Sequence, residues 1–179
     1  MKLHKPFGIL AAITLILVSL AITAFGQTQT NTPTSFIQTV GLWFTSFNTN
    51  YDSTFRDSKG SAWAGVDSLT GSEVPIANEI GLSYTVSGRF SAEAVFRDGG
   101  VTGTMISSQA GVNYAITIHD AQLIGYADAG WNHVDEKAFG EVGLRVRKAL
   151  TEHTFAQLGL GVKIPDGDRI FSVSAGFVF

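Results

Sequence analysis

The chain has 179 residues, enough for one domain with a sizeable core. It contains no cysteine, which excludes a disulfide framework and a thiolate metal site. Charged residues make up only 15% of the chain and there are 20 glycines, a composition that favours β-structure that does not meet water on every side.

The amino terminus has the pattern of a secretory signal peptide. A basic start is followed by an uncharged apolar run over residues 7–25. Small residues at positions 24 and 26 predict cleavage after Gly26, so that residues 1–26 form the signal peptide. The alternative is a retained membrane anchor, because the apolar run is just long enough to span a bilayer.

The charge balance argues against one class of partner. The whole chain has a net charge of −3, and removal of residues 1–26 takes away two lysines and makes the balance more acidic. Nucleic-acid binding depends on basic groups that neutralise phosphates, so we expect no nucleic-acid partner.

Residues 27–60 are predicted to form a linker that contains a short amphipathic helix at about 35–47. The apolar residues of that segment recur at helical spacing: Phe36, Ile37, Val40, Trp43, Phe44 and Phe47. Such a helix would either lie on the inner leaflet as an interfacial brace or plug a lumen. An extra strand over 51–56 is an open alternative.

From Ser61 to Phe179 the hydrophobic period changes to two and stays there. Apolar residues alternate with small or polar ones in eight segments of roughly ten residues each, which predicts eight antiparallel strands. The segments are SAWAGVDSL, ANEIGLSYTVSG, RFSAEAVFR, MISSQAGVNYAITIH, AQLIGYADAGW, FGEVGLRVRK, TFAQLGLGVKI and FSVSAGFVF.

The connections between these strands sort by length. One end of the strands has the short connections: the predicted turns Ser87–Arg89 and His119–Asp120 and the segment ALTEH. The start of the first strand and the end of the last strand lie at the same end. The connections at the other end are mostly longer and richer in charge. Short inner turns and longer outer loops are typical of an outer-membrane barrel with up-and-down topology.

The two faces of the predicted strands differ in charge. One face is apolar and uncharged through the middle of every strand after the first, whereas the other carries charges of both signs, which we predict to form a barrel-interior charge cluster. Its members are Asp67, Glu79, Glu93, Arg97, Asp128, Glu141, Arg145, Arg147 and Lys163. The alternative is a soluble sandwich or lipocalin-like barrel, in which the apolar face forms the core.

On these features the segment from Ser61 to Phe179 resembles the small eight-stranded outer-membrane β-barrel proteins of Gram-negative type, with OmpA/OmpX-like architecture. The resemblance implies an all-β fold, a closed antiparallel transmembrane barrel in the outer membrane with lipid around it. It also implies that the barrel-assembly machinery reads the terminal strand as an assembly signal, here Phe171, Val173, Phe177 and Phe179. A leading helix is a departure from the minimal barrel of this kind.

An eight-stranded barrel is filled by its own side chains, so we expect a structural or surface role and no general pore. We expect a monomer without enzymatic activity, and assign no catalytic, cofactor-binding or metal-binding residue. One alternative is a lipid-modifying enzyme that uses His133, with Asp135 and Glu136, as a base. Another is transport of small hydrophobic molecules by lateral opening of a wall thinned by glycines, at positions 111, 125, 130, 143, 159, 161 and 176.

Overall fold

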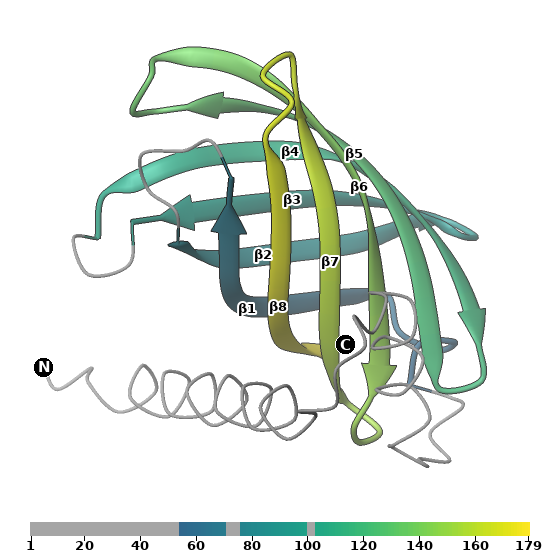
Figure 1. Cartoon of the computed structure of the whole chain (residues 1–179). Coiled ribbons are helices and arrows are strands. Elements are labelled where there is room, and N and C mark those ends of the chain that lie inside the picture. Colours follow the sequence, from purple (N-terminus) through teal and green to yellow (C-terminus); the bar gives the residue numbers. More distant parts are fainter. Residues whose placement is uncertain (1–53, 71–75, 100–102) are drawn as a thin grey trace, which may run out of the picture. The chain divides into compact units, whose positions relative to one another are not determined.

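The computed structural model describes residues 54–70, 76–99 and 103–179. These residues close into a barrel of eight antiparallel strands in sequential order (Figure 1), which confirms the predicted fold class. The strands are β1 (Gly60–Leu69), β2 (Ile76–Ser87), β3 (Phe90–Asp98), β4 (Met105–Ile118), β5 (Ala121–Asn132), β6 (Lys137–Ala149), β7 (Thr154–Ile164) and β8 (Arg169–Val178). Within the described ranges, no helix is long and apolar enough to cross a membrane.

Two of the predicted segments lie outside the described residues: the signal peptide over 1–26 and the helix over 35–47. The possible extra strand over 51–56 is described only in its second half, where Thr54, Phe55 and Arg56 form a turn. No strand therefore precedes β1 between residues 54 and 59.

The barrel closes where β8 pairs with β1 (Figure 1). Ala62 lies opposite Phe177, and Val66 lies opposite Val173. The last residue extends the pairing: the Phe179 N–H donates to the Gly60 carbonyl at 3.0 Å, and a Phe179 oxygen accepts from the Gly60 N–H at 2.9 Å. Closure thus uses the chain up to its last residue and leaves no open sheet edge.

The barrel has two different ends. The short-turn end contains the β2–β3, β4–β5 and β6–β7 connections, together with the start of β1 and the end of β8. The loop end contains the other four connections. The predicted two-residue turn His119–Asp120 is confirmed, with His119 at φ 52°, and Ile118 pairs with Ala121 across it.

Irregularities in the β2–β3 and β3–β4 pairing differ from two sequence predictions, the length of the β2–β3 turn and the direction of Ile106. Val86 is skipped in the β2–β3 register, so Ser87 pairs with Phe90 and the turn is one residue shorter than predicted. Ile106 is skipped between β3 and β4, and it points inward with only 3% of its surface exposed. Strict alternation placed Ile106 on the outward face, and the bulge reverses that placement because it inserts one extra residue.

The inward Ile106 belongs to an apolar group at the loop end of the interior. We call this group the loop-end cluster; it comprises Leu69, Ala77, Ile106 and Ile170. All four are nearly fully buried. Apolar side chains therefore occupy the interior at this end of the barrel.

Glycines allow large aromatic side chains to fit inside the narrow barrel. Trp63 pairs with Gly81, and Tyr126 pairs with Gly143. A Cβ atom built on Gly81 would lie 2.6 Å from Trp63 Nε1, and one on Gly143 would lie 2.6 Å from Tyr126 Oη. The aromatic rings occupy the volume that larger side chains on the opposite strand would need.

Contact with interior side chains likewise explains six of the seven glycines considered for wall thinning. A Cβ atom added at any of these six would contact an interior side chain; the six are Gly111, Gly130, Gly143, Gly159, Gly161 and Gly176. Gly125 differs, because its Cβ would meet only Leu144 Cδ2, at 3.8 Å.

These contacts generate a matched pair of variants. Gly143→Ala is expected to lower the free energy of unfolding by about 1–3 kcal/mol, because the new methyl group collides with Tyr126. Gly125→Ala is expected to change it by less than about 0.5 kcal/mol. Urea unfolding of the protein in lipid vesicles, followed by migration of unboiled samples on gels, measures both; equal midpoints would contradict tight packing around Tyr126.

Candidate functional site

The outward face of the barrel is apolar. Large hydrophobic side chains with more than a third of their surface exposed occur on most strands, among them Ile80, Leu82, Val112, Leu144 and Leu160. A soluble protein buries such residues, and a contiguous exposed belt of this kind is covered by another apolar medium. A lipid bilayer is the medium that surrounds a closed barrel on all sides.

Aromatic residues lie at both edges of this belt. The exposed aromatic side chains at the short-turn end are Tyr84, Phe90, Tyr114, Phe177 and Phe179. Towards the loop end, Phe96 and Trp131 are likewise exposed. Paired aromatic girdles are typical of proteins that cross a bilayer, because these side chains favour the membrane–water interface.

The inward face carries the charges. The structure places every member of the expected charge cluster inside the barrel, with at most 7% of any of these residues exposed. They are not one uniform network: three arginines at successive depths have different surroundings.

Arg97 lies nearest the loop end and joins three strands through their carboxylates. Its Nε contacts Asp67, its Nη2 lies 3.4 Å from Glu79, and its Nη1 lies 2.8 Å from Glu141 Oε2. Tyr126 Oη donates to Glu141 Oε1 at 2.9 Å. One guanidinium therefore ties β1, β2 and β6 to β3 across the interior.

Arg145 forms the next layer. Its Nη1 donates to both oxygens of Glu93 at 2.8 Å, and its Nη2 lies 4.0 Å from Asp128. The guanidinium lies over the Tyr126 ring, with 3.7 Å between Cζ and the ring centroid. This arginine is compensated by carboxylates, as Arg97 is.

Arg147 lies closest to the short-turn end and has no carboxylate partner among the described residues. Its Nε donates to Gln157 Oε1 at 2.6 Å, and its Nη1 donates to Ser61 Oγ at 2.9 Å. Its Nη2 is buried without a hydrogen-bond partner. Lys163 also lacks a described ion pair, but its Nζ lies 5.0 Å from the centre of the Phe139 ring.

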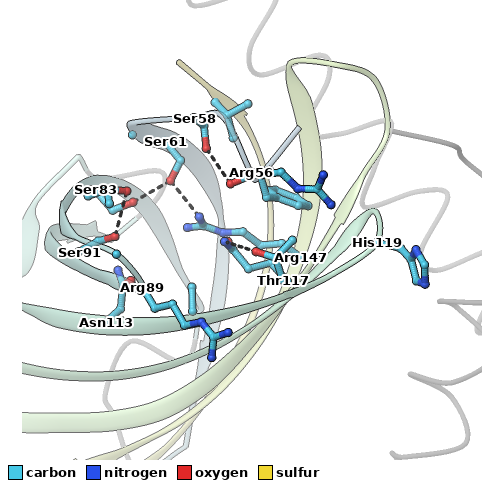
Figure 2. Close-up of a pocket in the computed structure, with 17 residues that line it drawn as sticks. Arg56, Ser58, Ser61, Ser83, Arg89, Ser91, Asn113, Thr117, His119 and Arg147 are labelled. Carbon is cyan, nitrogen blue, oxygen red and sulfur yellow. Dashed lines mark hydrogen bonds between the residues drawn. The ribbon is translucent and has the colours of Figure 1, made fainter. Parts of the chain in front are cut away.

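Arg147 forms part of the wall of a cavity of about 310 Å³ that opens at the short-turn end. Figure 2 shows the Arg147 side chain reaching between polar side chains from several strands, with Ser61 hydrogen-bonded both to Arg147 and to Ser83. We call this space the mouth cavity.

Sequence reasoning did not single out the neutral partners of the charges. Trp63 donates to Glu79 Oε1 at 2.6 Å, and Gln109 accepts from Arg97 at 2.7 Å. Trp63 has the same parity along β1 as Asp67, and Gln109 lies on the polar face of β4, so alternation is the signal that would have identified them.

The residues of the enzyme alternative all lie in the described part of the chain and make no hydrogen bond to one another. His133 Nε2 is 3.0 Å from Ser108 Oγ, while the Asp135 carboxylate accepts from Asn132. A histidine base is normally oriented by a third group. Among the residues that the structure describes, no carboxylate is hydrogen-bonded to His133. The same part of the chain contains no group of three or more His, Asp or Glu residues that could hold a metal ion.

The fold and the polarity of its two faces define an eight-stranded transmembrane β-barrel. No protein-family model matches the chain, and no curated protein matches its sequence.

Solved structures share the fold. A de novo designed transmembrane β-barrel is 12% identical, with 67% of this chain and 94% of that chain covered and a TM-score of 0.53. The N-terminal β-barrel domain of Pseudomonas aeruginosa OprF is 10% identical, with 68% and 98% covered and a TM-score of 0.50. Yersinia pestis Ail, determined in a phospholipid bilayer nanodisc, is 13% identical, with 69% and 100% covered and a TM-score of 0.47. At these identities the likeness concerns the fold alone.

The Arg97 layer predicts a large effect of a single substitution. Arg97→Met leaves the carboxylates of Asp67, Glu79 and Glu141 buried without their cation, and is expected to lower the free energy of unfolding by about 3–5 kcal/mol. Arg169→Met, at an exposed arginine of the loop end, is the control and is expected to change it by less than about 0.5 kcal/mol.

Urea unfolding in vesicles measures both variants. A double variant, Arg97→Met with Glu141→Gln, is expected to recover part of the loss, since one uncompensated charge is removed. An Arg97→Met protein as stable as the parent would contradict the central role of this arginine.

Proposed function

We propose that the chain is an integral barrel of a bacterial-type outer membrane that has a structural or surface-presenting role and does not act as a general pore. The observation that carries this proposal is the Arg97 layer, in which one buried guanidinium spans the interior to carboxylates on β1, β2 and β6. A water-filled channel needs an open path along the axis, and these side chains occupy it.

Two further features support the closed interior. Arg145 and its partner Glu93 form a second buried ion pair, on the short-turn side of Arg97. The loop-end cluster places four apolar residues in the interior at the loop end. Ions crossing the barrel would have to pass apolar side chains and break buried ion pairs. Both barriers cost several kcal/mol.

The proposed partners follow from the outer surface. Lipid covers the apolar belt, and the two aromatic girdles lie at its two interfaces. We propose that the barrel is a monomer, because closure of β8 on β1 leaves no strand edge for a second copy. We also propose that the barrel has no enzymatic activity. The position of His133 supports this, because its hydrogen-bond partner is Ser108, whereas a catalytic histidine base is normally oriented by a carboxylate.

Planar-bilayer recordings test the closed interior. The purified full chain, inserted into a planar bilayer, is expected to show no large and steady conductance, whereas a sixteen-stranded porin recorded under the same conditions provides the positive control. Samples must show heat-modifiable migration before recording, which ensures that the barrel is folded. Reproducible, porin-sized conductance steps from such samples would overturn the proposed closed interior.

The terminal strand also enters the proposal, as an assembly signal read by the barrel-assembly machinery. Phe179 is 53% exposed and outward-facing, so its ring has little to contribute to interior packing. Its backbone closes the barrel in any case, because the hydrogen bonds to Gly60 do not involve the side chain. The ring is thus free to act during assembly.

Phe179→Ala and Phe90→Ala separate assembly from stability. Phe90 is 56% exposed at the same end of the barrel but lies in β3, away from the carboxyl terminus. Phe179→Ala is expected to reduce the amount of folded barrel in cell envelopes several-fold, while Phe90→Ala does not. Their urea midpoints after refolding from denaturant are expected to agree within about 1 kcal/mol. Equal envelope levels for both variants would remove the special role of Phe179.

A further inference from the structure

The mouth cavity has an unusual charge composition. Among the residues that the structure describes, its lining includes three arginines and one histidine but no aspartate or glutamate. The remaining polar lining is neutral and consists of Ser58, Ser61, Ser83, Thr85, Ser91, Asn113, Thr117 and Gln122. Deeper inside the barrel Arg97 and Arg145 are paired with carboxylates, so the described lining of the mouth cavity is positive by comparison.

The buried arginine of this cavity is incompletely satisfied. Arg147 is 3% exposed, and within the described part of the chain its hydrogen bonds go to the neutral Gln157 and Ser61. Its Cζ lies 4.9 Å from the Trp63 ring centroid and 4.6 Å from that of Phe155. Aromatic faces attract a cation but do not accept the hydrogen bond that Nη2 leaves unmade.

Among the described residues, the nearest carboxylate layer makes no ion pair with Arg147. Glu93 is held on both of its oxygens by Arg145, and Asn113 Nδ2 donates to Glu93 Oε2 at 2.6 Å. Glu93 is therefore engaged by Arg145 and Asn113 and has no described contact with Arg147. A buried guanidinium without a counter-ion is costly, and an anion from outside would relieve that cost.

Hydroxyl groups lie beside Arg147, and a second arginine lines the mouth of the cavity. Ser83 Oγ is 2.8 Å from Ser61 Oγ, which bonds Arg147 (Figure 2). Arg89, in the β2–β3 turn, lies at the exposed rim of the cavity and its Nη1 is 3.2 Å from Tyr114 Oη. Guanidinium and hydroxyl groups are the donors that a tetrahedral oxyanion prefers.

We propose that the mouth cavity binds a phosphate group, held by Arg147 and Ser83 inside and by Arg89 at the rim. The volume of about 310 Å³ admits a small phosphate ester and excludes a large ligand. The same chemistry could come from a soluble phosphate compound or from the headgroup of a lipid at the short-turn end. The site goes beyond the proposed surface role and does not depend on it.

Tryptophan fluorescence provides a direct readout, because Trp63 lies against Arg147. The experiment uses the full chain with Trp43→Phe and Trp131→Phe, so that Trp63 is the remaining tryptophan. Inorganic phosphate is titrated at constant ionic strength against sodium chloride, with heat-modifiable migration confirming that the barrel stays folded. Phosphate is expected to produce a saturable change in Trp63 emission, and chloride is not.

Three variants locate the site. Arg147→Gln is expected to weaken phosphate binding by about tenfold or more, since it removes a charge-assisted hydrogen bond. Ser83→Ala and Arg89→Gln are expected to weaken it several-fold, and they keep the test decisive if Arg147→Gln does not fold. Arg169→Gln, at an exposed arginine of the loop end, is the matched control and is expected to bind as the parent does.

Two arms distinguish the sources of the phosphate group. Saturation by inorganic phosphate in lipid-free detergent micelles identifies a soluble ligand. An emission change that instead requires phosphatidylglycerol in phosphatidylcholine nanodiscs, and that Arg147→Gln or Ser83→Ala weakens, identifies a lipid headgroup. No saturable response in either arm, or equal weakening by Arg169→Gln, overturns the proposal, and a folded, non-conducting barrel in the same samples leaves the proposed surface role intact.

Discussion

Closure of the sheet is the constraint on which the rest of this structure depends. In a bilayer no water is available to an unpaired backbone group, so every N–H and C=O of a spanning strand must find a partner within the protein. The pairing of β1 with β8 meets this requirement, and the hydrogen bonds between Gly60 and Phe179 extend it to the end of the chain. With eight strands the barrel is narrow, so inward side chains of different strands meet across its interior.

Filling a narrow interior from alternate positions requires two compromises. Large aromatic residues fit only where the opposite strand has glycine, as at Tyr126 and Gly143. Most of the buried charges meet opposite charges, as at Arg97 and Arg145, and among the described residues Arg147 is an exception. Packing and electrostatics are therefore coupled in this barrel. Tyr126 packs against Gly143 of β6 and also donates a hydrogen bond to Glu141 of the same strand.

The charges are nevertheless distributed unevenly along the barrel axis. Arg97 is surrounded by three carboxylates, Arg145 by two, and Arg147 by none among the described residues. The interior is consequently negative towards the loop end and positive towards the short-turn end. This gradient, and not the total charge, gives the mouth cavity its preference for an anion. A residue count over the whole interior would miss it.

The amino-acid sequence by itself determined the strand number, the up-and-down order, the two faces and the set of inward charges, because a period of two is a local property that accumulates over eight strands. It did not determine where that alternation breaks: the bulge that turns Ile106 inward arises from the register between β3 and β4. Nor could it assign partners to the arginines, since Arg97 and Glu141 are 44 residues apart and meet only after closure. The mouth cavity likewise exists only in the closed barrel, because its lining side chains come from several strands that closure brings together at the short-turn end.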